Sequence, residues 1–232
     1  MRLTYKVLAT ATAAFALASA AQAVPVALSK LTGVTGGTLS GTAVYKADLS
    51  SIGLSSVLSI GVRDNSGLLG GSAGQFSGFD LDAIKLSTTD CGDATCAQGA
   101  VGLSVFNFTT GTIFSPGTQR APADPKLFGT DGSGVAVDNV VATLGLFDAE
   151  NTTGPTVFGF LSLGDDGAID FNLTGAVLTA GLFLYIGEVG DNGEVAAGSI
   201  IVRDTTSVPE PGGLALLGLA AAGFASWRRR RA

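Results

Sequence analysis

Short apolar runs, separated by clusters of Gly, Asp, Asn and Ser, fill the middle of this chain and restrict its fold more than any other feature. Several runs alternate apolar and polar residues, which places the apolar side chains on one face of a strand. Glycine, which occurs 34 times, disfavours long helices and suits tight turns. We therefore expect an all-β fold, an antiparallel β-sandwich or jelly-roll-like domain of about nine strands.

The expected strands follow the apolar runs. They cover residues 42–49, 57–63, 79–86, 101–108, 137–147, 156–163, 169–173, 182–188 and 200–203. The alternation slips by one position after Asp82, which indicates a β-bulge. Residues 115–134 lack strand character and contain three prolines, so we expect a long irregular connection there, either functional or a crossover between sheets.

Two turn sequences predict hairpins. Residues 158–163 return through Gly164-Asp165-Asp166-Gly167 into residues 169–171. Residues 182–189 return through Gly190-Asp191-Asn192-Gly193 towards residues 199–203. Gly and Asp tolerate the positive φ angles that tight hairpin turns require, so both turns fit antiparallel neighbours.

The N-terminus has the pattern of a secretory signal peptide at residues 1–23. Arg2 and Lys6 precede an apolar stretch at residues 7–20, and Ala21-Gln22-Ala23 is an A-x-A cleavage site for signal peptidase. The mature chain would then start at Val24, and residues 24–207 would form the ectodomain.

The C-terminus has the pattern of a second targeting signal. Val208-Pro209-Glu210-Pro211 forms an extended collar, because proline disrupts a helix interior. Residues 212–227 carry no charge and would reach roughly 24 Å as a helix, a short transmembrane span with Trp227 at the interface. Arg228, Arg229, Arg230 and Arg231 follow, and the positive-inside rule predicts that they stay cytoplasmic while the ectodomain lies outside.

This tail resembles the PEP-CTERM sorting signal through its Pro209-Glu210-Pro211 triplet, its short Gly/Leu/Ala segment and its arginine cluster. The resemblance implies recognition by an exosortase-like membrane protease, cleavage near the triplet and transfer to the cell envelope or an extracellular polymer. Tails of this kind also carry a label taken from the C-terminal region of ice-binding proteins, which gives no indication of ice binding.

Composition narrows the function of the ectodomain. Its seven basic and eighteen acidic residues give a formal charge of −11, which disfavours nucleic acid as a partner. The chain has no histidine, which excludes Ser-His-Asp and Cys-His catalysis and His-ligated zinc. The only tyrosines of the ectodomain are Tyr45 and Tyr185, and it has no tryptophan, so an aromatic platform for a glycosidase is lacking. We therefore expect no enzyme.

Two sets of residues are candidates for local chemistry. Cys91 and Cys96 are close in an exported chain, which predicts a disulfide. Carboxylates gather at Asp80/Asp82, Asp148/Glu150, Asp165/Asp166/Asp170 and Asp191/Glu194. Such groups suit calcium, although none has EF-hand spacing and turn-forming residues explain each cluster as well. No other cofactor is expected, and the metal ligands stay unknown.

These observations predict an exported, non-enzymatic structural or interaction protein of the cell envelope or extracellular matrix. Its precursor would lie in the inner membrane through the C-terminal helix before processing to the cell surface or matrix. The alternative is a calcium-dependent module that binds carbohydrate or exopolysaccharide.

Overall fold

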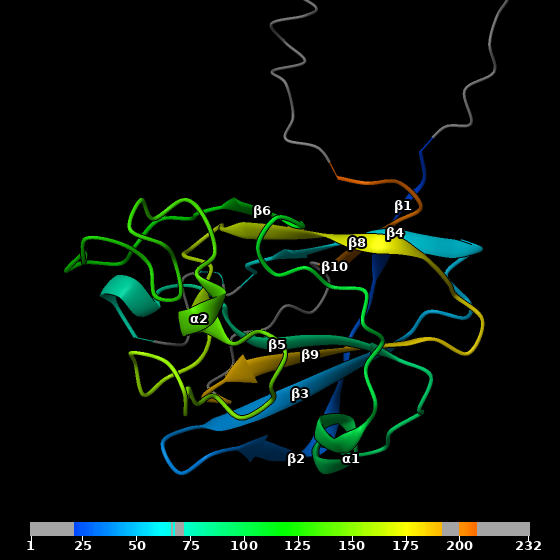
Figure 1. Ribbon diagram of the computed structural model, residues 1–232, viewed down its shortest axis with the longest axis horizontal. Coiled ribbons are helices and arrows are strands. Elements are labelled where there is room, and N and C mark those ends of the chain that lie inside the picture. Colours follow the sequence, from blue (N-terminus) through cyan, green and yellow to red (C-terminus); the bar gives the residue numbers. More distant parts are fainter. Residues whose placement is uncertain (1–20, 66, 68–71, 192–199, 208–232) are drawn as a thin grey trace, which may run out of the picture.

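Two antiparallel sheets packed face to face form the domain in a computed structural model, which describes residues 21–65, 67, 72–191 and 200–207 (Figure 1). Sheet A contains, in spatial order, β1 (Ala23–Val26), β10 (Ile200–Arg203), β4 (Ser56–Arg63), β8 (Ala168–Leu178) and β6 (Thr112–Ser115). Sheet B contains β2 (Ser29–Gly36), β3 (Gly41–Asp48), β9 (Phe183–Val189), β5 (Asp80–Ser87) and β7 (Leu161–Ser162). The antiparallel β architecture is therefore confirmed. The two expected terminal helices lie outside the described residues.

The hydrophobic core lies between the sheets. Alternate residues of the strands point inward, such as Ile60 and Val62 of β4 and Ile169 and Phe171 of β8, all at most 1% exposed. This period of two is the alternation that the sequence displays. Burial of these side chains is the main favourable contribution to folding, about 25 cal/mol per Å² of apolar surface.

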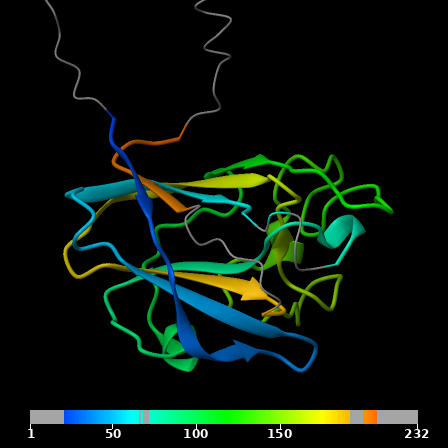
Figure 2. The same ribbon diagram turned by 180° about the vertical axis from the view of Figure 1, so that it is seen from behind.

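The two ends of the described chain meet in sheet A. Ala23 pairs with Arg203 and Val26 with Ile200, so β1 and β10 lie antiparallel. The chain then continues almost directly from β1 in sheet A to β2 at the edge of sheet B, as the blue segment in Figure 2 shows. Strands β1 and β2 were not expected from the sequence, because Pro25 interrupts the apolar pattern of β1 and Gly33 interrupts that of β2.

The outer face of sheet B is covered. Helix α1 (Ala94–Gly99) packs on it, capped at its N-terminus by the Asp93 carboxylate, which accepts a hydrogen bond from the Cys96 N–H at 2.8 Å. Cys91, which precedes the helix, and Cys96 within it form the predicted disulfide, and we call residues 89–96 the disulfide loop. The Tyr185 hydroxyl accepts from the Cys91 N–H at 2.9 Å and donates to the Thr89 carbonyl at 2.6 Å. These bonds fix the loop to β9.

A buried carboxylate attaches a second covering segment to sheet B. Asp82 is fully buried at the predicted bulge of β5, where the register shifts between Leu81 and Ala83. Its Oδ2 accepts from the Thr42 hydroxyl at 2.7 Å and its Oδ1 from the Ala149 N–H at 3.0 Å. Burial raises the pKa of Asp82 to about 8 and exceeds the opposing effect of the two hydrogen bonds.

Both predicted hairpins are wrong. Strand β7 belongs to sheet B and β8 to sheet A, and β9 and β10 are likewise in different sheets. The chain therefore changes sheets between β7 and β8 and again between β9 and β10. The first turn does have the expected positive φ angles at Gly164 and Asp166, but Asp165 pairs with Thr118. Gly and Asp supply a sharp change of direction, which an arch between sheets needs as much as a hairpin does.

Two predicted strands are also wrong. Residues 101–108 contribute an isolated bridge from Phe106 to Leu173, and residues 137–147 contain the short helix α2 (Asn139–Ala142). Residues 156–163 form the two-residue strand β7 at their end. Their apolar side chains still pack on the core, where Leu144 and Leu161 are fully buried and Phe106 and Phe108 partly buried. Short apolar runs do not by themselves distinguish a strand from such packing.

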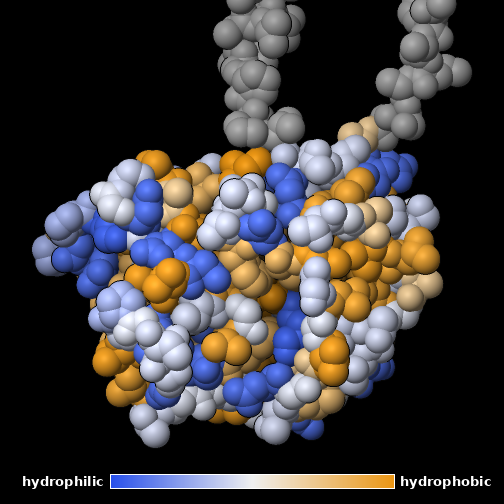
Figure 3. All heavy atoms as spheres, viewed as in Figure 1, coloured by the Kyte–Doolittle hydropathy of each residue, from blue (hydrophilic) through white to orange (hydrophobic). Residues whose placement is uncertain are grey.

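The irregular segment at residues 115–134 is confirmed apart from Ser115, which ends β6. It lies at the left-hand end in Figure 1, where Figure 3 shows hydrophilic side chains gathering. Leu127 and Thr130 of this segment are buried, so the segment packs on the sandwich. The short 3-10 helix η1 (Gly74–Phe76) contacts it, because the Phe128 N–H donates to the Gln75 carbonyl at 2.9 Å.

The first prediction concerns the Tyr185 hydroxyl. We expect Tyr185→Phe to lower the free energy of unfolding by about 1–3 kcal/mol, because it leaves the buried Cys91 N–H without its acceptor. Tyr45→Phe is the matched control, since the Tyr45 hydroxyl has no hydrogen bond with any described residue. Urea unfolding of both variants measures the difference. Equal losses would show that the hydroxyl does not attach the disulfide loop.

The second prediction concerns pH. Folded Asp82 keeps its proton up to about pH 8, whereas an unfolded Asp releases it near pH 4. The free energy of unfolding should therefore fall as pH rises from about 4 to about 8. Asp82→Asn should remove most of this fall and keep the fold, because an amide can serve both Thr42 and Ala149. Denaturant unfolding across that range measures it.

Asp131→Asn is the control for the pH series. The Ser133 hydroxyl donates to the Asp131 carboxylate and lowers the pKa of that carboxyl from its usual value of about 4, so its titration lies below the pH range of the series. This control should therefore keep the wild-type slope. A wild-type slope in Asp82→Asn as well would assign the pH dependence to another group.

Candidate functional site: the face that carries the C-terminal signal

The predicted sorting residues Val208, Pro209, Glu210 and Pro211, the expected span at residues 212–227 and Arg228 to Arg231 lie outside the described residues. The described chain ends immediately before them, at Ser207. We call residues 204–207, which follow β10, the strap. Its path fixes the place on the domain from which the signal starts.

The strap leaves the direction of β10 and crosses the outer side of sheet A. The Ser59 hydroxyl of β4 donates to the Thr205 carbonyl at 2.7 Å. The side-chain amide of Asn172 on β8 then binds Ser207 through both of its polar atoms. Its Oδ1 accepts from the Ser207 N–H at 2.7 Å, and its Nδ2 donates to the Ser207 carbonyl at 3.0 Å. The Asn172 side chain thus bonds to the backbone N–H and carbonyl of Ser207, as a neighbouring strand would, and fixes the last residue before the signal.

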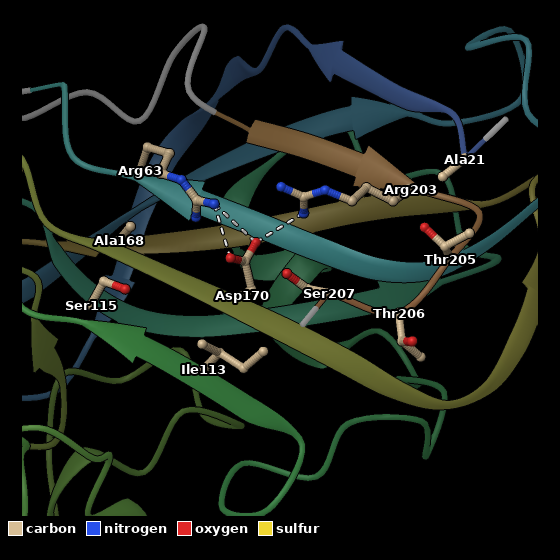
Figure 4. Close-up of a pocket in the computed structure, with 10 residues that line it drawn as sticks. All are labelled: Ala21, Arg63, Ile113, Ser115, Ala168, Asp170, Arg203, Thr205, Thr206 and Ser207. Atoms are coloured by element: carbon tan, nitrogen blue, oxygen red, sulfur yellow. Dashed lines mark hydrogen bonds and ion pairs between the residues drawn. The ribbon is translucent and has the colours of Figure 1, made fainter. Parts of the chain in front are cut away.

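A cluster of two arginines and one aspartate lies beside the strap (Figure 4). Arg63 of β4 donates through Nη2 to both oxygens of Asp170 on β8, at 3.2 and 2.9 Å, and Arg203 of β10 donates through Nη1 to Oδ1 at 2.9 Å. Gly61 leaves room for this cluster, since a side chain there would meet the Asp170 Oδ1 at 2.4 Å. Charge-assisted bonds of this kind hold both guanidinium groups on the outer face.

The cluster borders a hollow of about 640 Å³ on the same face. Its other walls come from the strap, from β6 and from Ala21, so it lies where the two ends of the described chain come together. The hollow is lined by Ala21, Arg63, Ile113, Ser115, Ala168, Asp170, Arg203, Thr205, Thr206 and Ser207.

The predicted signal-peptidase site is adjacent to the strap. The Gln22 N–H donates to the Asp204 carboxylate at 2.9 Å, and Ala23 is the first residue of β1. Ala21 lines the hollow. The A-x-A site is therefore part of the pairing between β1 and the start of the strap. The rest of the predicted signal peptide, residues 1–20, lies outside the described residues.

The four carboxylate clusters do not form a common site, although Asp82 lies near Asp148 through its bond to the Ala149 N–H. Asp80 accepts from the Ser162 hydroxyl at 2.5 Å, Asp165 pairs with Arg120 at 3.4 Å, and Asp191 pairs with Lys30. Within residues 21–65, 67, 72–191 and 200–207, no group of three or more His, Cys, Asp or Glu is placed to hold a metal ion. Glu194 lies outside these ranges.

Two further predicted acids stabilise loops. The Glu150 Oε1 accepts from the backbone N–H groups of Thr38 and Leu39 at 2.5 and 3.1 Å, and Asp148 accepts from the Glu150 N–H at 3.2 Å. They thus serve as hydrogen-bond acceptors for turns, one of the two interpretations that the sequence allowed.

Of the residues that line the hollow, the sequence had singled out Ala21 and Asp170, but sequence reasoning missed the arginines beside them and the asparagine that fixes the strap. Asn172, Arg63 and Arg203 occupy outward positions of strands whose inward positions are apolar. The alternation could have placed them on the outer face. Their proximity depends on β10 lying next to β4, and no local pattern indicates that pairing.

In the described part of the chain no helix has the length and apolar character that a membrane crossing requires. In the comparison with known families, residues 207–231 match the PEP-CTERM protein-sorting motif. No curated protein and no solved structure matches the chain.

The matched segment begins at Ser207, the residue that Asn172 fixes, and includes the triplet and the arginines on which the resemblance rests. It gives no support to the ice-binding label. The chain thus carries a PEP-CTERM protein-sorting motif, which implies an exported, surface-directed protein whose membrane-anchored precursor is processed by an exosortase.

Proposed function

We propose that the protein is a non-enzymatic structural or interaction component of the cell envelope or extracellular matrix, exported by a signal peptide and released from its anchor near Pro209-Glu210-Pro211. The observation that carries the proposal is the sorting motif at residues 207–231. It joins a folded β domain at Ser207 without an intervening linker.

The side chains of the domain support a non-enzymatic role. The carboxylates that could act as acid and base make structural bonds: Asp82 attaches a loop, Asp170 joins two strands through their arginines, and Asp165 pairs with Arg120. A glycosidase needs two carboxyl groups facing each other across a sugar site. The strongly acidic composition suits a soluble protein displayed outside the cell.

The third prediction tests processing. Trp227 is the only tryptophan, so a protein cut near the triplet should lose tryptophan emission and keep that of Tyr45 and Tyr185. In a host that contains an exosortase, the intact mass should correspond to a chain from Val24 to about Val208, apart from any attached group. In the same host without the exosortase, Trp227 and its emission should remain.

Glu210→Ala is the variant for recognition, and Glu194→Ala is its control, with the same substitution outside the matched segment. We expect Glu210→Ala to accumulate as uncut precursor in the inner membrane and Glu194→Ala to be processed like the wild type. A mature surface protein that still contains Trp227 and all four arginines would contradict sorting and leave a permanent anchor.

The structural role has its own test. We expect calorimetry of the mature protein with calcium to show no binding, and we expect exopolysaccharide to retain it equally with and without calcium. Retention that depends on calcium would contradict the proposal and favour a calcium-dependent carbohydrate-binding module.

A further inference from the structure

We infer that in the membrane-anchored precursor the outer face of sheet A lies against the lipid surface, with Arg63 and Arg203 directed toward the headgroup phosphates. The inference rests on the membrane-anchored precursor of the proposed function. It goes further, because the sorting motif does not specify which face of the domain meets the membrane.

The first argument is the length of the tether. The last fixed residue is Ser207, bound to Asn172 on the outer side of sheet A, and the uncharged stretch begins at Gly212. Five residue steps span at most about 18 Å even when fully extended. A folded domain of about 185 residues is about 40 Å across. The tether is therefore too short to turn sheet B toward the membrane while the strap stays bound.

The second argument is that sheet A is the less covered of the two sheets. Helix α1 and the segment attached to Asp82 pack on the outer face of sheet B. In the described part of the chain, the corresponding face of sheet A has no helix and is crossed by the strap. Both ends of the described chain lie on this upper side in Figure 1.

The third argument is charge. The five strands of sheet A carry three charged residues, Arg63, Asp170 and Arg203, and the strap adds Asp204. This face is therefore close to neutral in a domain with a formal charge of −11. Anionic lipid headgroups repel the rest of the domain and attract basic residues, and the cluster of Arg63, Arg203 and Asp170 has a formal charge of +1. Arg63 and Arg203 have 30% and 19% of their side-chain surface exposed, toward the hollow.

Tryptophan quenching by lipid tests the orientation. In a Trp227→Phe background, Ser115→Trp places a reporter on β6, across the hollow from the strap, and Val34→Trp places one on β2 of sheet B, where Val34 is 51% exposed. Each full-length chain is reconstituted into vesicles of phosphatidylcholine and phosphatidylglycerol that include lipid with a nitroxide on its headgroup. We expect strong loss of fluorescence at Ser115→Trp and almost none at Val34→Trp.

A neutral version of the cluster tests the arginines. The combined change Arg63→Gln, Asp170→Asn and Arg203→Gln keeps hydrogen-bonding groups and leaves no uncompensated carboxylate. It should reduce quenching of the Ser115→Trp reporter while circular dichroism shows that the sheets are retained. Unchanged quenching would overturn the part of the inference that assigns the contact to the arginines.

The outcomes separate this inference from the proposed function. Equal quenching at both reporters, or stronger quenching at Val34→Trp, in chains that float with the vesicles would overturn the orientation and leave the anchored precursor intact. Chains that do not float with the vesicles would overturn the anchored precursor, and the orientation with it.

Discussion

The pairing of β1 with β10 is the contact on which the rest of the structure depends. It joins residues about 180 positions apart, Ala23 and Arg203, and thereby adds β1 to the edge of sheet A. Because the chain passes from β1 directly to β2, the same contact also positions the edge of sheet B. A long loop must be closed to form it, at a cost in entropy that rises only slowly with length. Core burial on both sheets offsets that cost.

Much of the fold was predictable from alternation alone. Strands β3, β4, β5, β8, β9 and β10 and the bulge of β5 follow from apolar residues at every second position. Strand pairing was not predictable, because residues 164–167 and 190–193 have the chemistry of hairpin turns, whereas the strands before and after each of them belong to different sheets. Local patterns report which face a side chain occupies, whereas pairing depends on contacts between distant segments.

The candidate site divides in the same way. The C-terminal signal is a contiguous motif of characteristic order, so the sequence was sufficient to find it, as was the case for the Cys91–Cys96 disulfide. The face that carries the signal is assembled from separate strands through Asn172, Arg63 and Arg203. In the acidic clusters, residues that are close in sequence do not form a site. Asp82 and Glu150 are neighbours of other acids in sequence but bind backbone and hydroxyl groups.

The strap also has a mechanical consequence. A protein held through its C-terminus receives a pulling force at Ser207, and the two bonds with Asn172 bear that force first, followed by the bond between Ser59 and Thr205. These bonds lie one after another along the strap, so a force on Ser207 breaks them in order, from Ser207 back to Thr205. Three freed residues lengthen the tether by about 10 Å. Strand β10 remains bonded to β1 and β4 on either side, so the strap extends under load before the sandwich opens.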